Sequence, residues 1–149
     1  MTLYQSMAIA GMGLDTQVER LQIHTTNMAN IGTPGYVRKI PVLVENANVP
    51  FDALLSKMRT DGPAAAMAAS TPQGVQLLEA VDDPTPGKKI YQPNHPLADE
   101  QGFVTMSNTN PMGDMADAMV ANRMYEANLA LYGVTKTMAS KALELGQAR

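Results

Sequence analysis

Apolar side chains recur at helical spacing along the last part of the chain. Met124, Leu131 and Met138 stand seven residues apart, a spacing that places them on one face of a helix lying against a second helix. Pro111 suits the first position of that helix, where a backbone N–H is not needed. The pattern therefore predicts one helix over residues 111–146, much longer than the average of about 11 or 12 residues.

A second apolar pattern of the same kind covers the first thirty residues and includes Leu14 and Leu21. It predicts a helix over residues 2–30 that pairs with the C-terminal helix in a coiled-coil-like arrangement. Because a long helix depends on the burial of its apolar face, we expect both ends to be mobile in a free monomer and ordered in an assembly. The expected seam contacts are Leu14, Leu21, Met124, Leu131 and Met138.

The segment between the predicted helices has the character of strands and turns. Eight of the 10 prolines lie from Pro41 to Pro96, and proline interrupts a helix interior. Residues 60–72 contain the turn sequence Asp61-Gly62-Pro63 followed by an alanine-rich, uncharged stretch, and they predict a flexible loop. Runs rich in β-branched and aliphatic side chains predict three strands, over residues 36–44, 74–81 and 102–106.

Together these elements predict an α+β fold in which paired terminal helices accompany a small β-rich middle domain. Residues 1–35 would supply the N-terminal helix and turn of an inner helical domain, and residues 110–149 would supply its C-terminal helix. Residues 36–109 would form the middle domain. The chain therefore divides into helical ends and a non-helical centre.

Composition narrows the range of partners and chemistry. A net charge of -3 gives no basic field for nucleic acid or an anionic membrane. With Cys 0 the chain has no disulfide and no thiolate metal site. The apolar run at residues 7–14 is far shorter than the ~20 residues that cross a bilayer, and no basic residue precedes it. We expect no nucleic-acid partner, no membrane insertion and no cleaved signal peptide.

Candidate catalytic or metal-binding side chains are few. His24 lies in the first predicted helix, where a histidine is far more often a packing or surface residue than a ligand or a base. His95 is followed within five residues by Asp99 and Glu100, so a hydrolytic or metal site is one interpretation. A lone histidine without a second at ligand spacing favours a structural role instead. We expect that the chain is not an enzyme and that it binds no cofactor and no metal.

Three motifs, in this order along the chain, resemble those of bacterial flagellar axial proteins. Residues 27–36 read NMANIGTPGY and resemble the signature that ends the first helix of these proteins. Residues 91–104 read YQPNHPLADEQGFV and resemble a segment typical of short proximal rod members of the family. Residues 122–128 read NRMYEAN and match the family pattern Arg-x-Tyr-x-Ala-Asn. The resemblance covers residues 1–44 and 88–149.

The resemblance implies a structural subunit of the bacterial flagellar basal-body rod. In such proteins the terminal helices of many subunits pack around the axis of a hollow tube that transmits motor torque to the hook. The implied partners are other copies, other rod proteins and the flagellar type III export apparatus, and the implied location is the periplasmic rod. Asn122 departs from the serine that the family often has. The motif residues expected to fix the joint and the subunit contacts are Asn30, Thr33, Gly35, Tyr36, Arg123, Tyr125 and Asn128.

Two other structural interpretations fit the same pattern. The first is a different short flagellar rod protein, although the segment at residues 91–104 favours the proximal type. The second is a cytosolic coiled-coil adaptor, which would keep stable helices as a monomer and bind a soluble partner. These interpretations, together with the hydrolytic or metal site at His95, are the alternatives to a proximal rod subunit.

Overall fold

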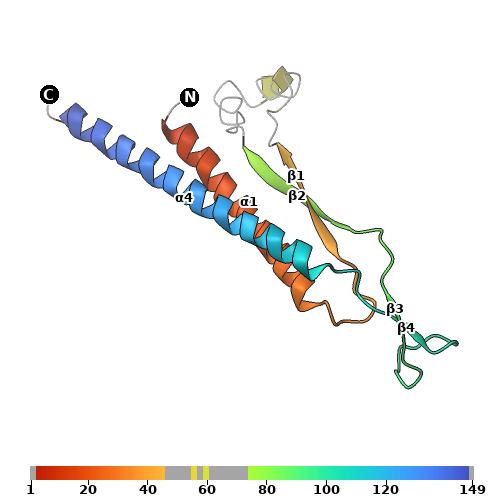
Figure 1. The fold of residues 1–149 in the computed structure, drawn as a ribbon. Coiled ribbons are helices and arrows are strands. Elements are labelled where there is room, and N and C mark those ends of the chain that lie inside the picture. Colours follow the sequence, from red (N-terminus) through yellow and green to blue (C-terminus); the bar gives the residue numbers. More distant parts are fainter. Residues whose placement is uncertain (1–2, 46–54, 57–58, 61–73, 148–149) are drawn as a thin grey trace. The chain divides into compact units, whose positions relative to one another are not determined.

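The computed structural model describes residues 3–45, 55–56, 59–60 and 74–147. Two long helices dominate it, α1 near the N-terminus and α4 near the C-terminus, and four strands lie between them in the sequence (Figure 1). The bounds are α1 Leu3–Ala29, β1 Lys39–Glu45, β2 Val75–Asp82, β3 Lys89–Tyr91, β4 Phe103–Thr105 and α4 Pro111–Gln147. This element order confirms the predicted α+β fold with helical ends.

Both helices lie within a residue or two of their predicted positions. Helix α1 has 27 residues and α4 has 37; the predicted start at residue 2 falls outside the described residues. At its beginning, α4 is capped by Asn110, whose side-chain oxygen accepts a hydrogen bond from the Gly113 N–H at 3.4 Å. Within the described part of the chain, neither helix has a stretch long and apolar enough to cross a membrane.

The strands form two separate two-stranded sheets. Strand β1 pairs with β2, and β3 pairs with β4 in antiparallel register with Ile90 opposite Val104. The second sheet is closed by the rings of Tyr91 and Phe103, which lie edge to face with centroids 5.3 Å apart. Three of the four strands overlap predicted ones, whereas β3 was not predicted. The predicted loop over residues 60–72 lies, apart from residue 60, outside the described residues.

The chain forms two compact units, and each contains part of both helices. One unit comprises residues 1–16, 44–76 and 126–149, and the other comprises residues 17–43 and 77–125. In the first unit α1 and α4 approach closely at Gly13. A Cβ atom added at this residue would lie 2.8 Å from the Asn128 side-chain nitrogen. The predicted division into domains at residues 35 and 110 remains a prediction.

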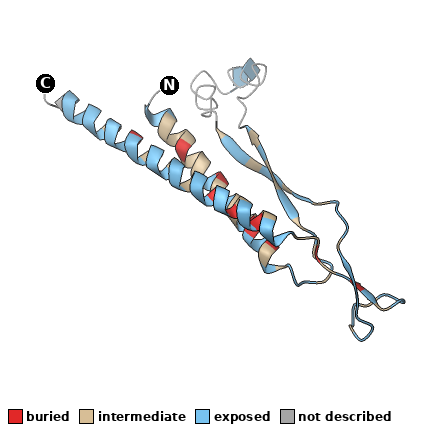
Figure 2. Cartoon of the chain, in the orientation of Figure 1, coloured by how far each residue is buried: buried red, intermediate tan, exposed pale blue. Residues whose placement is uncertain are grey.

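The buried face of α4 is made of small and polar side chains. Its buried and half-buried positions recur at alternating steps of four and three residues, the spacing of a helix seam. Figure 2 shows these few positions in red and tan, while most of the helix is exposed. The positions with this spacing are Asp114, Ala118, Ala121, Tyr125, Asn128, Tyr132, Thr135 and Ala139, and Gly113 and Asp117 beside them are half-buried as well.

Candidate functional site

The second compact unit contains a buried polar cluster around Asp114, in the first turn of α4. The Asp114 carboxylate lies 2.9 Å from His24 Nδ1 and 3.1 Å from the Asn27 side-chain nitrogen. Arg38 donates to both carboxylate oxygens, from Nε at 3.0 Å and from Nη2 at 3.2 Å. An ionised carboxylate only accepts hydrogen bonds, so His24 Nδ1 carries a hydrogen. Three side chains from the first part of the chain thus converge on one acidic residue.

Local structure explains this convergence. His24 and Asn27 are three residues apart in α1 and therefore share one face of the helix. The turn after α1 reverses the chain, so that Arg38 comes back to the same region just before β1 begins. Asp114 is fully buried at the start of α4, where the helix dipole favours a negative charge.

The Asn27 amide joins the end of α1 to the beginning of β1. Its nitrogen donates to the Lys39 carbonyl at 2.7 Å, and its oxygen accepts from the Lys39 N–H at 2.9 Å. The same oxygen also accepts from the Tyr36 hydroxyl at 3.0 Å. All the polar atoms of this fully buried side chain therefore have partners.

Asn108, three residues before α4, connects the segment just before β1 to the segment just after β2. Its oxygen accepts from the Arg38 N–H at 2.6 Å, and its nitrogen donates to the carbonyls of Asp83 at 3.1 Å and Thr85 at 2.8 Å. Arg38 Nη1 also lies 3.4 Å from the Asp83 carboxylate. We call the set His24, Asn27, Arg38, Asp83, Asn108 and Asp114 the polar joint.

Charge pairing stabilises the ionised form of Asp114. Burial by itself would raise the pKa of this carboxyl, because a charge is poorly solvated in the interior. The hydrogen bonds from Arg38, His24 and Asn27 and the positive charge of Arg38 outweigh that effect, and the pKa is lowered. The carboxylate is therefore held as an anion at the centre of the polar joint.

The other charged members of the polar joint shift in the matching directions. The hydrogen bond to Asp114 is the largest cause of a raised pKa at Arg38. The pKa of Asp83 is lowered, mainly by hydrogen bonds from the Thr85 hydroxyl and N–H and to a lesser extent by Arg38. Together the cluster keeps one guanidinium between two carboxylates, an arrangement suited to holding structure.

Four of the predicted motif residues build the turn that follows α1. The Asn30 side chain donates to the Thr26 carbonyl at 2.9 Å and accepts from the Thr33 hydroxyl at 3.2 Å. Gly35 adopts a φ of 75°, which favours glycine, and its N–H donates to the Thr105 carbonyl at 3.0 Å. Tyr36 then reaches back to Asn27.

The other three motif residues, in α4, have different surroundings. Tyr125 is half-buried and, with Leu21 of α1, lines a small hollow. Asn128 lies against Gly13. Arg123 is exposed and forms no hydrogen bond or ion pair with any described residue. The motif in α4 thus combines residues that contact α1 with one that faces solvent.

The predicted seam residues of α1 and those of α4 differ in exposure. Leu14 and Leu21 of α1 are half-buried, whereas Met124, Leu131 and Met138 of α4 are 51%, 56% and 57% exposed. Within one chain, α4 therefore presents its small and polar face to α1 and leaves its apolar face exposed. We call the exposed set Val120, Met124, Leu131, Val134 and Met138 the apolar stripe.

His95 and Asp99 form local backbone contacts. His95 Nδ1 accepts a hydrogen bond from the Leu97 N–H at 3.1 Å. The Asp99 carboxylate accepts from the N–H groups of Gln101 at 3.0 Å and Phe103 at 2.8 Å. Both side chains thus shape the loop between β3 and β4. Over the described ranges, no three His, Cys, Asp or Glu side chains group as a metal site.

Sequence reasoning did not single out the members of the polar joint. His24 was interpreted as a packing or surface residue, and the sequence contains no sign that it meets Asp114. The only available signal was Asn27, which belongs to the motif at residues 27–36 but was not among the expected site residues. A polar side chain in a helix interior invites the question of which buried groups it satisfies.

Known proteins resemble this chain over nearly its whole length. Residues 100–145 match the family described as flagellar basal body rod FlgEFG protein C-terminal. The flagellar basal-body rod protein FlgC of Yersinia enterocolitica is 31% identical over 147 residues, which cover 99% of this chain and 100% of that protein. The proteins of the same name from Escherichia coli O157:H7 and Bacillus subtilis are 32% and 29% identical, with the same coverage of 99% and 100%.

Proposed function

Because the chain belongs to the FlgC family of flagellar basal-body rod proteins, we propose that it is a structural subunit of the proximal rod. In this proposal the terminal helices of many copies, together with other rod proteins, pack into a helical tube. The tube transmits the torque of the motor to the hook. The observation that carries the proposal is the apolar stripe of α4, which the single chain leaves exposed.

The apolar stripe has the composition of a contact between helices. Its five residues are all 46% exposed or more in the single chain. Full burial of one such side chain contributes about 1.5–3 kcal/mol, so covering the stripe would strongly favour association. Its seven-residue spacing is that of knobs packing into the holes of a neighbouring helix. An interface along this stripe supports an assembly of subunits through their long helices.

The polar joint supports the mechanical part of the proposal. A subunit that transmits torque must resist bending where its helices meet the rest of the chain. Arg38 and Asp114 form two charge-assisted hydrogen bonds at this place, and such a fork fixes orientation as well as distance. The bonds of Asn27 and Asn108 add further constraints between α1, the start of β1 and the segment just after β2.

Location and partners follow from the same proposal. The subunit would lie in the periplasmic part of the basal body, with other flagellar rod proteins as neighbours. It would pass through the flagellar type III export apparatus without cleavage of a signal peptide. Each subunit would contact the next through different surfaces, and such contacts, when they do not close into a ring, generate a helical filament.

The alternatives make different use of the same features. A different short rod protein is disfavoured because relatives of one name match over the whole chain. A cytosolic coiled-coil adaptor would also cover the apolar stripe, but with a soluble partner. A catalytic role for His95 is disfavoured because its Nδ1 accepts a hydrogen bond from the Leu97 N–H, a contact that stabilises the loop between β3 and β4. We propose that the chain has no catalytic activity.

The test is to place a charge in the apolar stripe. In Leu131→Asp an exposed leucine becomes a carboxylate, which costs several kcal/mol once a neighbouring helix covers it but little in the free chain. We expect loss of rod assembly and of motility, measured by electron microscopy of isolated basal bodies and by swimming in soft agar. Circular dichroism of the purified protein should stay unchanged.

Ser140→Asp is the matched control. Ser140 is exposed and lies on α4 outside the apolar stripe, so the same charge on the same helix should leave assembly intact. Normal rods in Leu131→Asp would contradict the proposal. The proposal would also be contradicted if the wild-type chain formed a stable soluble complex with a cytosolic protein and was absent from basal bodies.

A further inference from the structure

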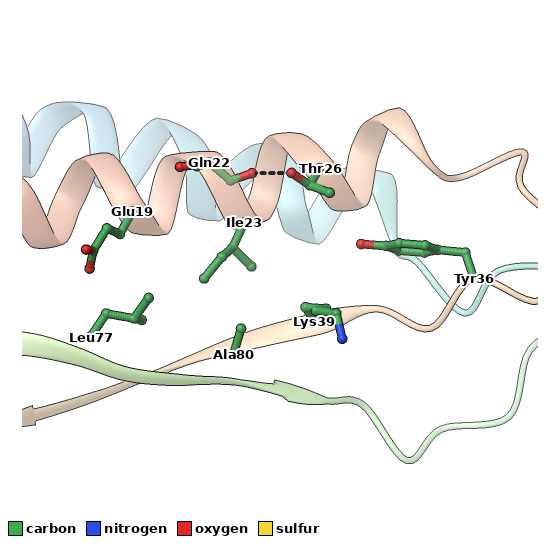
Figure 3. Close-up of a pocket in the computed structure, with 8 residues that line it drawn as sticks. All are labelled: Glu19, Gln22, Ile23, Thr26, Tyr36, Lys39, Leu77 and Ala80. Atoms are coloured by element: carbon green, nitrogen blue, oxygen red, sulfur yellow. Dashed lines mark hydrogen bonds between the residues drawn. The ribbon is translucent and has the colours of Figure 1, made fainter.

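A groove lies between α1 and the first sheet within the second compact unit. Its volume is about 390 Å³. In Figure 3 Ile23 points from α1 into this space, while Leu77 and Ala80 lie on the facing strand. The interior of the groove is therefore apolar. The full lining is Glu19, Gln22, Ile23, Thr26, Tyr36, Lys39, Leu77 and Ala80.

Among the described residues that line the groove, Glu19 is a charged side chain without a partner. Glu19 lies at one end (Figure 3) and forms no hydrogen bond or ion pair with any described residue. Lys39, which also lines the groove, is neutralised by Asp82 at 2.6 Å. A ligand that fits this groove should therefore combine apolar side chains with one positive charge near Glu19.

The matching features occur on α4. Arg123 is exposed and has no partner among the described residues. It is flanked by the exposed apolar side chains of Met119, Val120 and Met124. Methionine is flexible and fills irregular spaces well. This face of α4 therefore combines exposed apolar side chains with one positive charge that has no partner among the described residues. These features match the apolar interior of the groove and the negative charge of Glu19.

We propose that the groove of one subunit binds the Met119 to Met124 face of α4 from a second copy. Arg123 of the second copy then pairs with Glu19 of the subunit that supplies the groove. The inference rests on the proposed function and specifies one of its contacts. The groove and the helix face are different surfaces, so a subunit that uses its groove still offers its α4. Such a contact is heterologous and continues from copy to copy.

Charge reversal tests the pairing in assembled rods. Glu19→Arg and Arg123→Glu each bring like charges together across the contact, and we expect each to lower the number of assembled rods at least tenfold. The double variant restores opposite charges and should recover at least half of the wild-type number. Single variants that assemble normally, or a double variant no better than either single one, would overturn the inference.

Cysteine crosslinking gives a second, independent measurement. The chain has no cysteine of its own, so in a variant carrying Glu19→Cys and Arg123→Cys a disulfide between two copies can form only between the introduced residues. Oxidised basal bodies should give a ladder of crosslinked copies on a non-reducing gel. Mixing subunits that carry only one of the two substitutions should give dimers and nothing larger.

The control places the second cysteine at Lys136 and leaves Arg123 unchanged. Lys136 is another exposed cation of α4 that has no partner among the described residues. The pair Glu19→Cys and Lys136→Cys should give no ladder. An intrachain disulfide in the Glu19→Cys, Arg123→Cys variant, or a crosslink from Glu19→Cys to a different rod protein, would overturn the inference. If these results fail while Leu131→Asp still blocks assembly, the rod function stands and only this contact is wrong.

Discussion

His24 and Asp114 are 90 positions apart in the sequence, yet His24 Nδ1 lies 2.9 Å from the Asp114 carboxylate. Their side chains are only 4% and 0% exposed. The contact joins the last turns of α1 to the first turn of α4 in a region that excludes water. Around it, the polar joint turns one buried carboxylate into a shared acceptor for side chains from α1 and from the segment before β1.

Asp114→Ala should be the most destabilising single change in the polar joint. It removes the acceptor shared by His24, Asn27 and Arg38. Arg38 then keeps only its longer contacts with the carboxylates of Asp83, at 3.4 Å, and Asp117, at 3.8 Å. Loss of one partner from a buried pair costs about 3–5 kcal/mol. We expect a loss of that size in the free energy of unfolding, measured by urea titration with circular dichroism.

Asp117→Ala provides the control for that loss. Asp117 lies 3.8 Å from Arg38 Nη2 and its side chain is 49% exposed. An exposed ion pair contributes less than about 1 kcal/mol, so this variant should stay close to the wild type. Equal losses in both variants would show that net charge at the start of α4 matters, and that the buried geometry does not.

Stability should fall on the acid side because of Asp114 and Asp83. The pKa of each carboxyl is lower in the folded chain than its usual value, so the folded state favours the ionised form. That stabilisation is complete above the usual pKa, near 4, and is lost as the pH falls through the lower folded values. Urea titrations between pH 6 and pH 2 should show the loss.

The same experiment on Asp114→Asn isolates the contribution of one group. The difference in unfolding free energy between wild type and variant should be constant above about pH 5 and shrink as the pH falls below 4. A difference that stays constant down to pH 2 would mean that Asp114 does not titrate with a lowered pKa. A difference that shrinks already between pH 7 and pH 5 would point to another group.

The two asparagines of the first motif should differ in importance. Asn27→Ala leaves the Tyr36 hydroxyl and both backbone groups of Lys39 without their partner. Each unsatisfied buried group costs about 1–3 kcal/mol, so the loss should be on the order of 3–5 kcal/mol. Asn30→Ala removes exposed hydrogen bonds and should cost less than about 1.5 kcal/mol. Urea titration compares them; the reverse order would contradict the structure.

The two glycines inside α1 should respond differently to alanine. Nothing lies within 4 Å of a Cβ atom at Gly11, whereas one at Gly13 would be 2.8 Å from the Asn128 side-chain nitrogen. Gly11→Ala should therefore stabilise the chain by about 0.5–1 kcal/mol through helix propensity. Gly13→Ala should gain less, because Asn128 must move.

A double variant checks that interpretation. In an Asn128→Ala background the obstacle at Gly13 is removed, so Gly13→Ala should then stabilise by about the same amount as Gly11→Ala. The coupling between positions 13 and 128 is the difference between the two backgrounds. A coupling near zero in thermal or urea unfolding would show that the helices do not approach closely there.

The secondary structure was largely predictable from the sequence because the signals for it are local. The seven-residue spacing of Met124, Leu131 and Met138 and the Pro111 start gave the extent of α4 to within a residue. Strands β1, β2 and β4 overlap runs of β-branched and aliphatic residues. Strand β3 has only three residues, too few to show an alternating pattern, and it exists because β4 pairs with it.

The site was predictable only in part. Asn30, Thr33 and Tyr36 form hydrogen bonds within residues 26–36, and the positive φ of Gly35 is a local requirement of the turn, so a local motif could indicate all four. The bond from the Gly35 N–H to the Thr105 carbonyl is long-range and could not be predicted in this way. The polar joint depends on contacts between residues far apart in the sequence, and no pattern in one sequence pairs His24 with Asp114. The exposure of Arg123 likewise depends on which face of α4 meets α1.

The sequence by itself determined the two long helices, the strand-rich middle and the motifs of a rod protein, because periodicity, proline positions and turn residues act over a few residues. Only the tertiary structure decided how α4 is used. Its small and polar face approaches α1, since small side chains allow close approach and Asp114 finds its hydrogen-bond donors there. The more apolar face, with Met124, Leu131 and Met138, remains exposed, because packing within one chain covers only one side of the helix.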